Sequence, residues 1–163
     1  MAKRIESFRD LEVYKKAFAL QQEIFELTKS FPKEELYSLT DQMRRASRSV
    51  GSNIAEAWQK RRYIQHFVSK LSDSDGEQAE TQHWLDTAIA CGYIIRDERD
   101  VLVKNCKEIG RMLGSMMFNP EPFCRQFKKG WFYLSSVVCH LSSENTVLKN
   151  WLIPNSLSEY RME

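Results

Sequence analysis

The sequence predicts an all-α protein: an up-and-down four-helix bundle with a C-terminal helical extension. Three observations lead to this fold. Apolar residues recur at spacings of three and four along four long segments. Glycine and proline are scarce, at 6 and 4 of 163 residues. The gaps between the segments are short, which makes successive helices antiparallel neighbours. We expect residues 1–118 to form the bundle and residues 119–163 to form an extension of unknown role.

The first helix is expected over about residues 10–31. Pro32 ends it, because the residue before a proline is biased out of the α region. The predicted buried stripe consists of Leu11, Tyr14, Ala17, Phe18, Ile24, Phe25, Leu27 and Phe31.

The second helix is expected to begin after Ser38, whose hydroxyl is predicted to accept an early backbone N–H. Its apolar positions then follow in steps of three and four, which is typical of helices packed at a shallow angle. The predicted seam is Leu39, Met43, Ala46, Val50, Ile54 and Ala57.

The third helix is expected over about residues 64–93. Its predicted seam is Ile64, Val68, Leu71, Asp75, Gln78, Gln82, Leu85, Ile89 and Gly92. The middle of this seam is polar, and a buried polar group without a partner costs about 1–3 kcal/mol. We therefore predict a structural polar seam of Asn53, Asp75, Gln78 and Gln82, in which Asn53 of the second helix hydrogen-bonds to one of the glutamines.

The fourth helix is expected over about residues 97–117, where Pro120 and Pro122 follow it. The predicted core positions are Val101, Leu102, Ile109, Met112, Leu113 and Met116. Gly110 and Gly114 are expected to let another backbone approach. A short fifth helix is expected over about residues 123–141.

Charge is unevenly distributed along the chain, although the net charge is only +2. Residues 1–62 carry 13 Lys and Arg against 9 Asp and Glu, residues 63–100 carry 3 against 8, and residues 101–163 carry 8 against 5. A uniformly basic nucleic-acid-binding surface is therefore excluded. The acidic middle is expected to meet the basic first part, within one molecule or between copies.

The cysteines and the apolar stretches indicate a cytoplasmic protein. Cys91, Cys106, Cys124 and Cys139 are widely spaced, with no C-x-x-C pair, so we expect reduced thiols in the core. The N-terminus has no apolar run. The most apolar stretch, residues 131–141, is far shorter than the roughly 20 residues of a membrane span. We expect no membrane partner.

Patterns that carry chemistry are scarce. Glu80-x-x-His83 resembles one half of a di-iron bundle site, but no second copy exists and Glu80 points away from the predicted seam. No Gly-rich phosphate loop, Gly-x-Ser-x-Gly or Cys/His cluster occurs. We therefore expect no catalytic residue, no metal and no cofactor.

The stretch RRASRSVGSNIAEA, residues 44–57, combines cations with small side chains. The arginines lie about 120–160° from the seam of their helix, where they are either an ordinary solvated face or contacts for phosphate. The predicted nucleic-acid-binding residues are Arg44, Arg45, Arg48, Lys60, Arg61 and Arg62. The small residues are expected to face a neighbouring subunit or, alternatively, to be surface positions that a helix tolerates; they are Ser47, Gly51, Ser52 and Ala55.

Three segments resemble one bacterial family. DLEVYKKAF, LTDQMRRASRSVGSNIAEA and FVSKLSDSDGEQAETQHWLDTAIACGYI look like the four-helix bundle proteins first recognised as products of intervening sequences in large-subunit ribosomal RNA genes. The most specific parts are Asn53-Ile54-Ala55-Glu56, Glu80-Thr81-Gln82 and Trp84-Leu85. Together the segments span about residues 8–118. Ala57-Trp58 stands where many members have glycine, which bears on where the second helix ends.

The resemblance implies a bundle that assembles as a homo-oligomeric ring, typically a pentamer, without enzymatic activity. The fold also resembles the accessory protein of diversity-generating retroelements, which implies RNA or DNA as a partner. The acidic stretch of residues 72–75 argues against nucleic acid on that face of the third helix. Two hypotheses follow: a ring-forming scaffold or nucleic-acid-binding accessory protein, and alternatively a protein–protein interaction module with no nucleic-acid partner.

Overall fold

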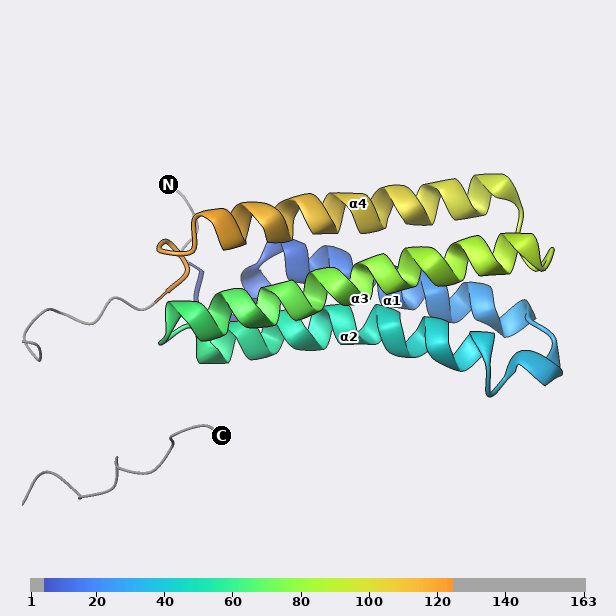
Figure 1. Ribbon diagram of the computed structural model, residues 1–163, viewed down its shortest axis with the longest axis horizontal. Coiled ribbons are helices and arrows are strands. Elements are labelled where there is room, and N and C mark those ends of the chain that lie inside the picture. The colour runs from blue at the N-terminus through green and yellow to red at the C-terminus, as the bar shows by residue number, and fades with distance from the viewer. Residues whose placement is uncertain (1–4, 125–163) are drawn as a thin grey trace, which may run out of the picture. The chain divides into compact units, whose positions relative to one another are not determined.

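A computed structural model describes residues 5–124 of the chain. Four long helices run side by side in alternating directions, namely α1 (Glu12–Leu27), α2 (Leu39–Lys60), α3 (Ile64–Ala90) and α4 (Arg96–Phe118) (Figure 1). Three short 3-10 turns accompany them, namely η1 (Phe8–Asp10), η2 (Thr28–Ser30) and η3 (Lys33–Glu35). The predicted all-α four-helix bundle is confirmed, and residues 5–124 contain no strand. The predicted fifth helix, Cys139 and most of the extension lie outside the described residues.

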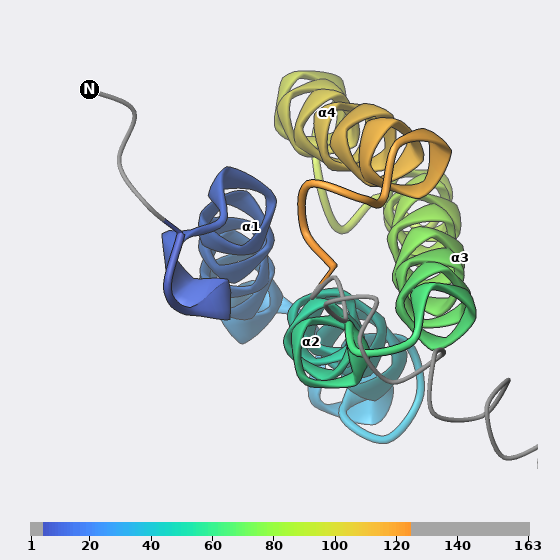
Figure 2. The same ribbon diagram turned by 90° about the vertical axis from the view of Figure 1, so that its left-hand side faces the viewer.

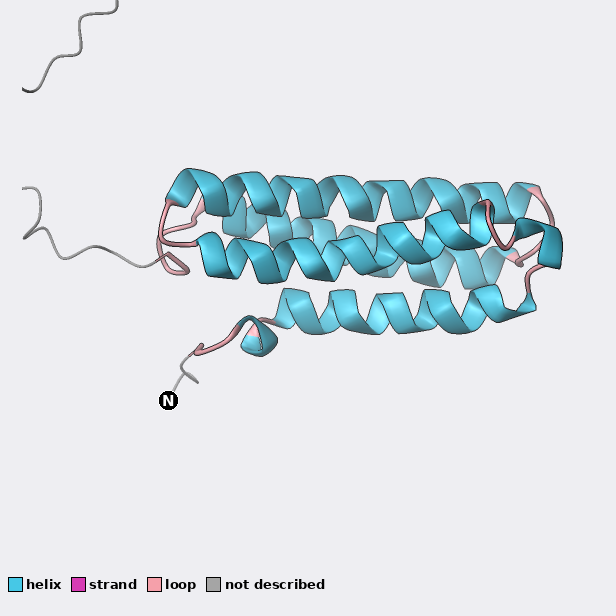
Figure 3. Cartoon of the chain, turned by 90° about the horizontal axis from the view of Figure 1, so that it is seen from below, coloured by secondary structure: helices cyan, strands magenta, loops and turns pink. Residues whose placement is uncertain are grey.

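Figure 2 shows the order of the helices around the bundle: α2 lies between α1 and α3, and α3 lies between α2 and α4. Short loops join them at alternate ends (Figure 3). Within the described part of the chain, none of these helices is both long and apolar enough to cross a membrane. α2 continues past Ala57 and Trp58 to Lys60, so the departure from the family pattern does not end it early.

α1 is shorter than predicted, and the face that it buries differs from the predicted one. It ends at Leu27 and continues into the 3-10 turn η2, where the hydroxyl of Thr28 donates to the carbonyl oxygen of Ile24 at 2.8 Å. Its buried positions are Val13, Ala17, Leu20 and Ile24. The prediction that Phe18 is buried is wrong: its side chain is 49% exposed. Tyr14, Phe25 and Leu27 are half-buried on the flank of the core.

The start of α2 is where it was predicted, but its cap is different. The carboxylate of Glu35 accepts the backbone N–H of Leu39 at 3.2 Å and also the hydroxyl of Ser38. Its other oxygen accepts the hydroxyl of Tyr93 at 3.1 Å. Ser38 itself makes no cap hydrogen bond, so the predicted role of its hydroxyl is wrong. This carboxylate ties the beginning of α2 to the end of α3.

α2 packs tightly against α3 along the predicted α2 seam. All six positions of that seam are buried, at 5% exposure or less. On α3, the predicted seam positions Leu71, Gln78 and Leu85 are buried, whereas the predicted position Ile64 is 44% exposed. At the centre, the buried hydroxyl of Ser74 donates to the carbonyl oxygen of Val50 at 2.9 Å. The buried positions of α3 are Phe67, Leu71, Ser74, Gln78, Thr81, Leu85 and Ala88.

The polar seam finds its partners along α3. The amide of Gln78 donates to Asp75 at 2.9 Å, and the amide of Gln82 donates to Gln78 at 2.8 Å. Gln78 is buried, while Asp75 and Gln82 are half-buried. The predicted partnership with Asn53 is wrong, since within residues 5–124 Asn53 hydrogen-bonds to neither glutamine. Gln78 instead faces α4, where its amide lies against Gly110.

Gly110 of α4 makes room for this polar side chain rather than for another backbone. A Cβ atom at Gly110 would lie only 2.9 Å from Nε2 of Gln78 and 3.2 Å from a carboxylate oxygen of Asp75. A Cβ atom at Gly114 would meet nothing within 4 Å. The two glycines of the predicted pair therefore have different roles.

The rest of α4 follows the predicted pattern with two differences. Leu102, Ile109, Leu113 and Met116 are buried as predicted, whereas Val101 is 59% exposed and Met112 is only half-buried. Val103 and Cys106 also belong to the core.

The cysteines differ in burial. Burial raises the pKa of the Cys106 thiol to about 12, which keeps it protonated. Cys91 is exposed and Cys124 is half-buried, so the expectation of core thiols is wrong for Cys91.

The contrast between the two α4 glycines can be measured. Gly114→Ala should raise the free energy of unfolding by about 0.5–1 kcal/mol, because alanine is the better helix former. The free energy of unfolding of Gly110→Ala should be at least about 1 kcal/mol lower than that of Gly114→Ala, because the new Cβ displaces the buried amide of Gln78 from its partners. Urea unfolding of both variants tests this, and equal midpoints would contradict the assigned role of Gly110.

The cap at Glu35 predicts a pH dependence. Hydrogen bonds from Ser38 and Leu39 lower the pKa of Glu35 below its ordinary 4.5, against an opposing effect of burial. The ionised carboxylate therefore stabilises the fold above that pH, and the contribution disappears as the pH falls through the lowered pKa. Glu35→Gln should lower the urea midpoint at neutral pH, and its difference from wild type should shrink below pH 4.5. Glu34→Gln is the exposed control, and an equal effect there would refute the cap.

Candidate nucleic-acid interface

Two of the predicted arginines meet on the flank of α2 that faces α1. The guanidinium carbons of Arg44 and Arg48 lie 4.9 and 5.9 Å from the centre of the Phe25 ring. Nε of Arg44 donates to the hydroxyl of Thr28 at 2.8 Å, which fixes the orientation of the fork. Within residues 5–124, neither arginine forms an ion pair. Arg44 therefore keeps its two terminal nitrogens for another anion.

A third cation completes this group. Nζ of Lys29 lies 4.8 Å from the centre of the same ring and 2.7 Å from the carboxylate of Glu26. We call Phe25, Lys29, Arg44 and Arg48 the Phe25 cluster. A cation over an aromatic face is attracted by the ring quadrupole, by about 0.5–1 kcal/mol at exposed sites. Since Glu26 offsets Lys29, the two arginines carry the net positive charge of the cluster.

Arg45 and Lys60 lie among carboxylates. Nη1 of Arg45 is 3.7 Å from Asp41, and Nζ of Lys60 is 3.5 Å from Glu56, which also pairs with Lys70 of α3 at 2.9 Å.

The charge of Arg45 also reaches α3. Burial raises the pKa of Glu77, the neighbouring charge of Glu80 adds to this, and Arg45 opposes it. The basic second helix and the acidic third helix thus meet within one chain on this flank.

Arg61 and Arg62 have different surroundings again. Arg61 is only 8% exposed, its guanidinium carbon lies 3.9 Å from the centre of the Trp58 ring, and its Nη1 donates to the backbone carbonyl of Trp58. The prediction that it faces outward is therefore wrong, because its stem and fork fold back over the last turn of α2. Arg62 is exposed, and its guanidinium carbon lies 5.8 Å from the centre of the Tyr63 ring.

The four small residues of α2 divide into two pairs. Ser47 is fully buried, and Gly51 is buried against α1, where an added Cβ would meet the Tyr14 ring at 3.8 Å. The expectation that these two face outward is wrong, since both are buried within the single chain, Gly51 against α1. Ser52 is exposed and Ala55 is half-buried, so these two remain predicted contacts for a second subunit.

Sequence reasoning missed the contribution of α1 to this surface. The sequence pattern predicts that Tyr14, Phe18 and Phe25 lie in the core, and it does not single out Thr28 or Lys29. A row of aromatic residues at helical spacing gives the same pattern on a core face and on a flank. One available signal was the pair of glutamines within this row, Gln21 and Gln22, which are uncommon in a core.

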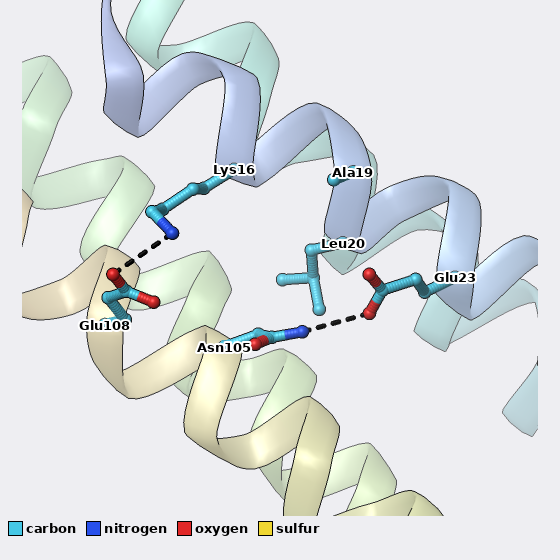
Figure 4. A pocket seen from close by; sticks show the side chains of 6 residues that line it. All are labelled: Lys16, Ala19, Leu20, Glu23, Asn105 and Glu108. Carbon is cyan, nitrogen blue, oxygen red and sulfur yellow. Dashed lines mark hydrogen bonds and ion pairs between the residues drawn. The ribbon is translucent and has the colours of Figure 1, made fainter.

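A small pocket between α1 and α4 offers a polar rim but no evident chemistry (Figure 4). Its volume is about 160 Å³. Lys16 pairs with Glu108 at 3.1 Å, and Asn105 donates to Glu23 at 3.0 Å, with Leu20 between the two pairs. Both carboxylates already have partners there.

The residues of the di-iron-like pattern also have partners. Glu80 accepts the indole N–H of Trp84 at 2.9 Å, and the ring of His83 lies 4.8 Å from that of Trp84. No three His, Cys, Asp or Glu side chains gather as a metal site in the described part of the chain.

Comparisons with known proteins agree with this architecture. The family model described as 23S rRNA-intervening sequence protein matches residues 9–115. A crystal structure from Bacteroides thetaiotaomicron, described as a protein with unknown function from the S23 ribosomal protein family, is similar with a TM-score of 0.60 and 28% identity. The match covers 66% of this chain and 96% of that one. No curated protein matches the chain.

The burial of Arg61 predicts a structural role. Arg61→Ala should lower the free energy of unfolding by about 1–3 kcal/mol, because it removes a buried stacking contact and leaves a backbone carbonyl without its partner. Arg45 is the control, because its side chain is 72% exposed. Arg45→Ala should change the free energy of unfolding by no more than about 0.5 kcal/mol. Thermal and urea unfolding measure both, and similar small effects would refute the structural role of Arg61.

Proposed function

Because the chain belongs to the 23S rRNA-intervening sequence protein family, we propose that it is a non-enzymatic RNA-binding accessory protein that works as a homo-oligomeric ring. The observation that carries the RNA-binding proposal is the Phe25 cluster. There Arg44 and Arg48 project from one flank of α2 with no ion-pair partner in the described residues. Of the six predicted cations, these two are the best placed to contact a phosphate backbone.

The chemistry of the cluster suits phosphate. A guanidinium fork presents parallel donors that match two phosphate oxygens, and it is more weakly hydrated than an ammonium group. Thr28 holds Arg44 by its Nε, so less conformational entropy is lost when its remaining donors bind. Each neutralised phosphate releases counterions, which favours binding and makes it sensitive to salt.

The non-enzymatic part of the proposal has support of a different kind. Neither the description of the family nor that of the similar crystal structure names a reaction. Around the Phe25 cluster, the polar side chains are a threonine hydroxyl, three cations and the carboxylate of Glu26, which pairs with Lys29, and this set offers no paired nucleophile and base.

The alternative is a protein–protein interaction module without RNA. It is favoured by the acidic side chains on the outer part of α3, which would suit the basic α2 of a second copy. Under this alternative, reversing the charges of Arg45 and Arg48 to Glu would reduce the mass of the assembly measured by light scattering. Under our proposal, the assembly persists and RNA binding is lost.

RNA binding can be tested with two charge-matched double variants. Arg44→Ala/Arg48→Ala should weaken binding of a labelled RNA and lower the slope of log K against log salt by about 0.7 per lost contact for a single strand. Arg45→Ala/Lys60→Ala removes the same charge from the flank rich in carboxylates and should weaken binding much less. Fluorescence anisotropy between about 50 and 200 mM salt measures both.

Two outcomes would contradict the proposal. Equal weakening by the two double variants would mean that binding depends on net charge and not on the Phe25 cluster. No binding by the wild-type chain at the lowest salt would mean that RNA is not its partner.

A further inference from the structure

A row of aromatic side chains on α1 extends the Phe25 cluster along the flank formed by α1 and α2. Tyr14, Phe18 and Phe25 lie within about 40° of one another around the axis of α1, since an α-helix has 3.6 residues per turn. We call these three residues the aromatic row. The rings of Tyr14 and Phe18 are 6.3 Å apart.

Both ends of the aromatic row contact α2. The Tyr14 ring lies 3.8 Å from the position of a Cβ atom at Gly51, and the Phe25 ring lies under the guanidinium groups of Arg44 and Arg48. Phe18 lies between these ends and must therefore project along the same flank. It is 49% exposed, so it presents a ring to solvent about 10 Å along the helix from Phe25, the ring that the two arginines cover.

From this arrangement we propose that the flank formed by α1 and α2 binds single-stranded RNA, with phosphates on Arg44 and Arg48 and an unpaired base stacked on Phe18. The inference rests on the proposed function and narrows its partner to RNA with unpaired bases. A side-chain ring can stack only on a base whose face is open, and the faces of bases inside a duplex are covered by their neighbours. Cationic grooves lined by aromatic rings are the common way of binding single strands.

The size of the surface agrees with a short single-stranded segment. From Tyr14 to Phe25 the helix rises by about 16 Å. A stacked strand advances about 3.4 Å per nucleotide, so the row accommodates about five nucleotides. An oligonucleotide of about ten nucleotides is therefore long enough as a probe.

A second copy of the chain is a less suitable occupant of this flank. It would have to supply carboxylates to the two arginines, because burying an unpaired guanidinium is costly. On α3, the carboxylate of Asp73 already pairs with Lys70 at 3.1 Å, and that of Glu80 accepts the indole N–H of Trp84 at 2.9 Å. A single-stranded RNA supplies both phosphates for the two arginines and an unpaired base for the ring of Phe18.

The experiment compares a labelled single-stranded RNA with a blunt duplex of the same sequence, using the full chain. Phe18→Ala should weaken single-strand binding about fivefold or more, equivalent to about 1 kcal/mol of stacking, and leave duplex binding unchanged. Phe18→Tyr should retain single-strand binding, whereas Phe18→Leu should behave like Phe18→Ala. Phe118→Ala is the matched control, because Phe118 is 93% exposed on α4, and it should have no effect.

Several results would overturn the inference. If the duplex binds as tightly as the single strand and Phe18→Ala has no effect, the single-strand inference fails while RNA binding through the Phe25 cluster stands. If Phe18→Leu binds as well as wild type, stacking is not the interaction. If Phe18→Ala changes the mass measured by light scattering, the flank is an interface between copies. If neither RNA binds at low salt, the proposed function itself fails.

Discussion

The close contact between α2 and α3 sets the geometry of the rest of the bundle. It is centred on the buried hydroxyl of Ser74, which donates to the carbonyl oxygen of Val50. A larger side chain at position 74 would hold the two helices further apart. An apolar side chain there would remove the hydrogen bond to Val50. Ser74 lies on the same buried face of α3 as Phe67 and Ala88, whereas Ile64 is exposed. Gln78 faces α4, where Gly110 leaves room for its amide.

The same contact separates the charges of α2 into two environments. On the flank toward α3, Arg45 and Lys60 lie among Asp41, Glu56 and Glu77, so their charges are largely balanced. On the flank toward α1, Arg44 and Arg48 have an aromatic ring and a threonine hydroxyl as neighbours. A run of cations that is uniform in the sequence is thus electrostatically uneven in space. This asymmetry is what directs the functional proposal to one flank.

The aromatic row illustrates why a functional surface is harder to predict from the sequence than the fold is. Phe18 and Ala17 are adjacent in the sequence, yet one is half exposed and the other is fully buried, because they lie 100° apart around α1. Choosing between them requires the direction from which the other helices approach. Arg61 is a similar case: its burial depends on how it folds back onto Trp58, which its position beside two other cations does not reveal.

The sequence by itself determined the fold class, the four helices to within a few residues and the complete α2 seam, because the spacing of apolar residues and the position of prolines are local properties. It also determined that the cations lie outside that seam. Only the tertiary structure decided the buried faces of α1 and α3, the partners of Gln78, the cap supplied by Glu35 and the burial of Ser47, Gly51 and Arg61. These depend on contacts between residues far apart in the chain, such as Tyr93 with Glu35 and Ser74 with Val50, and the pattern of one helix carries no information about them.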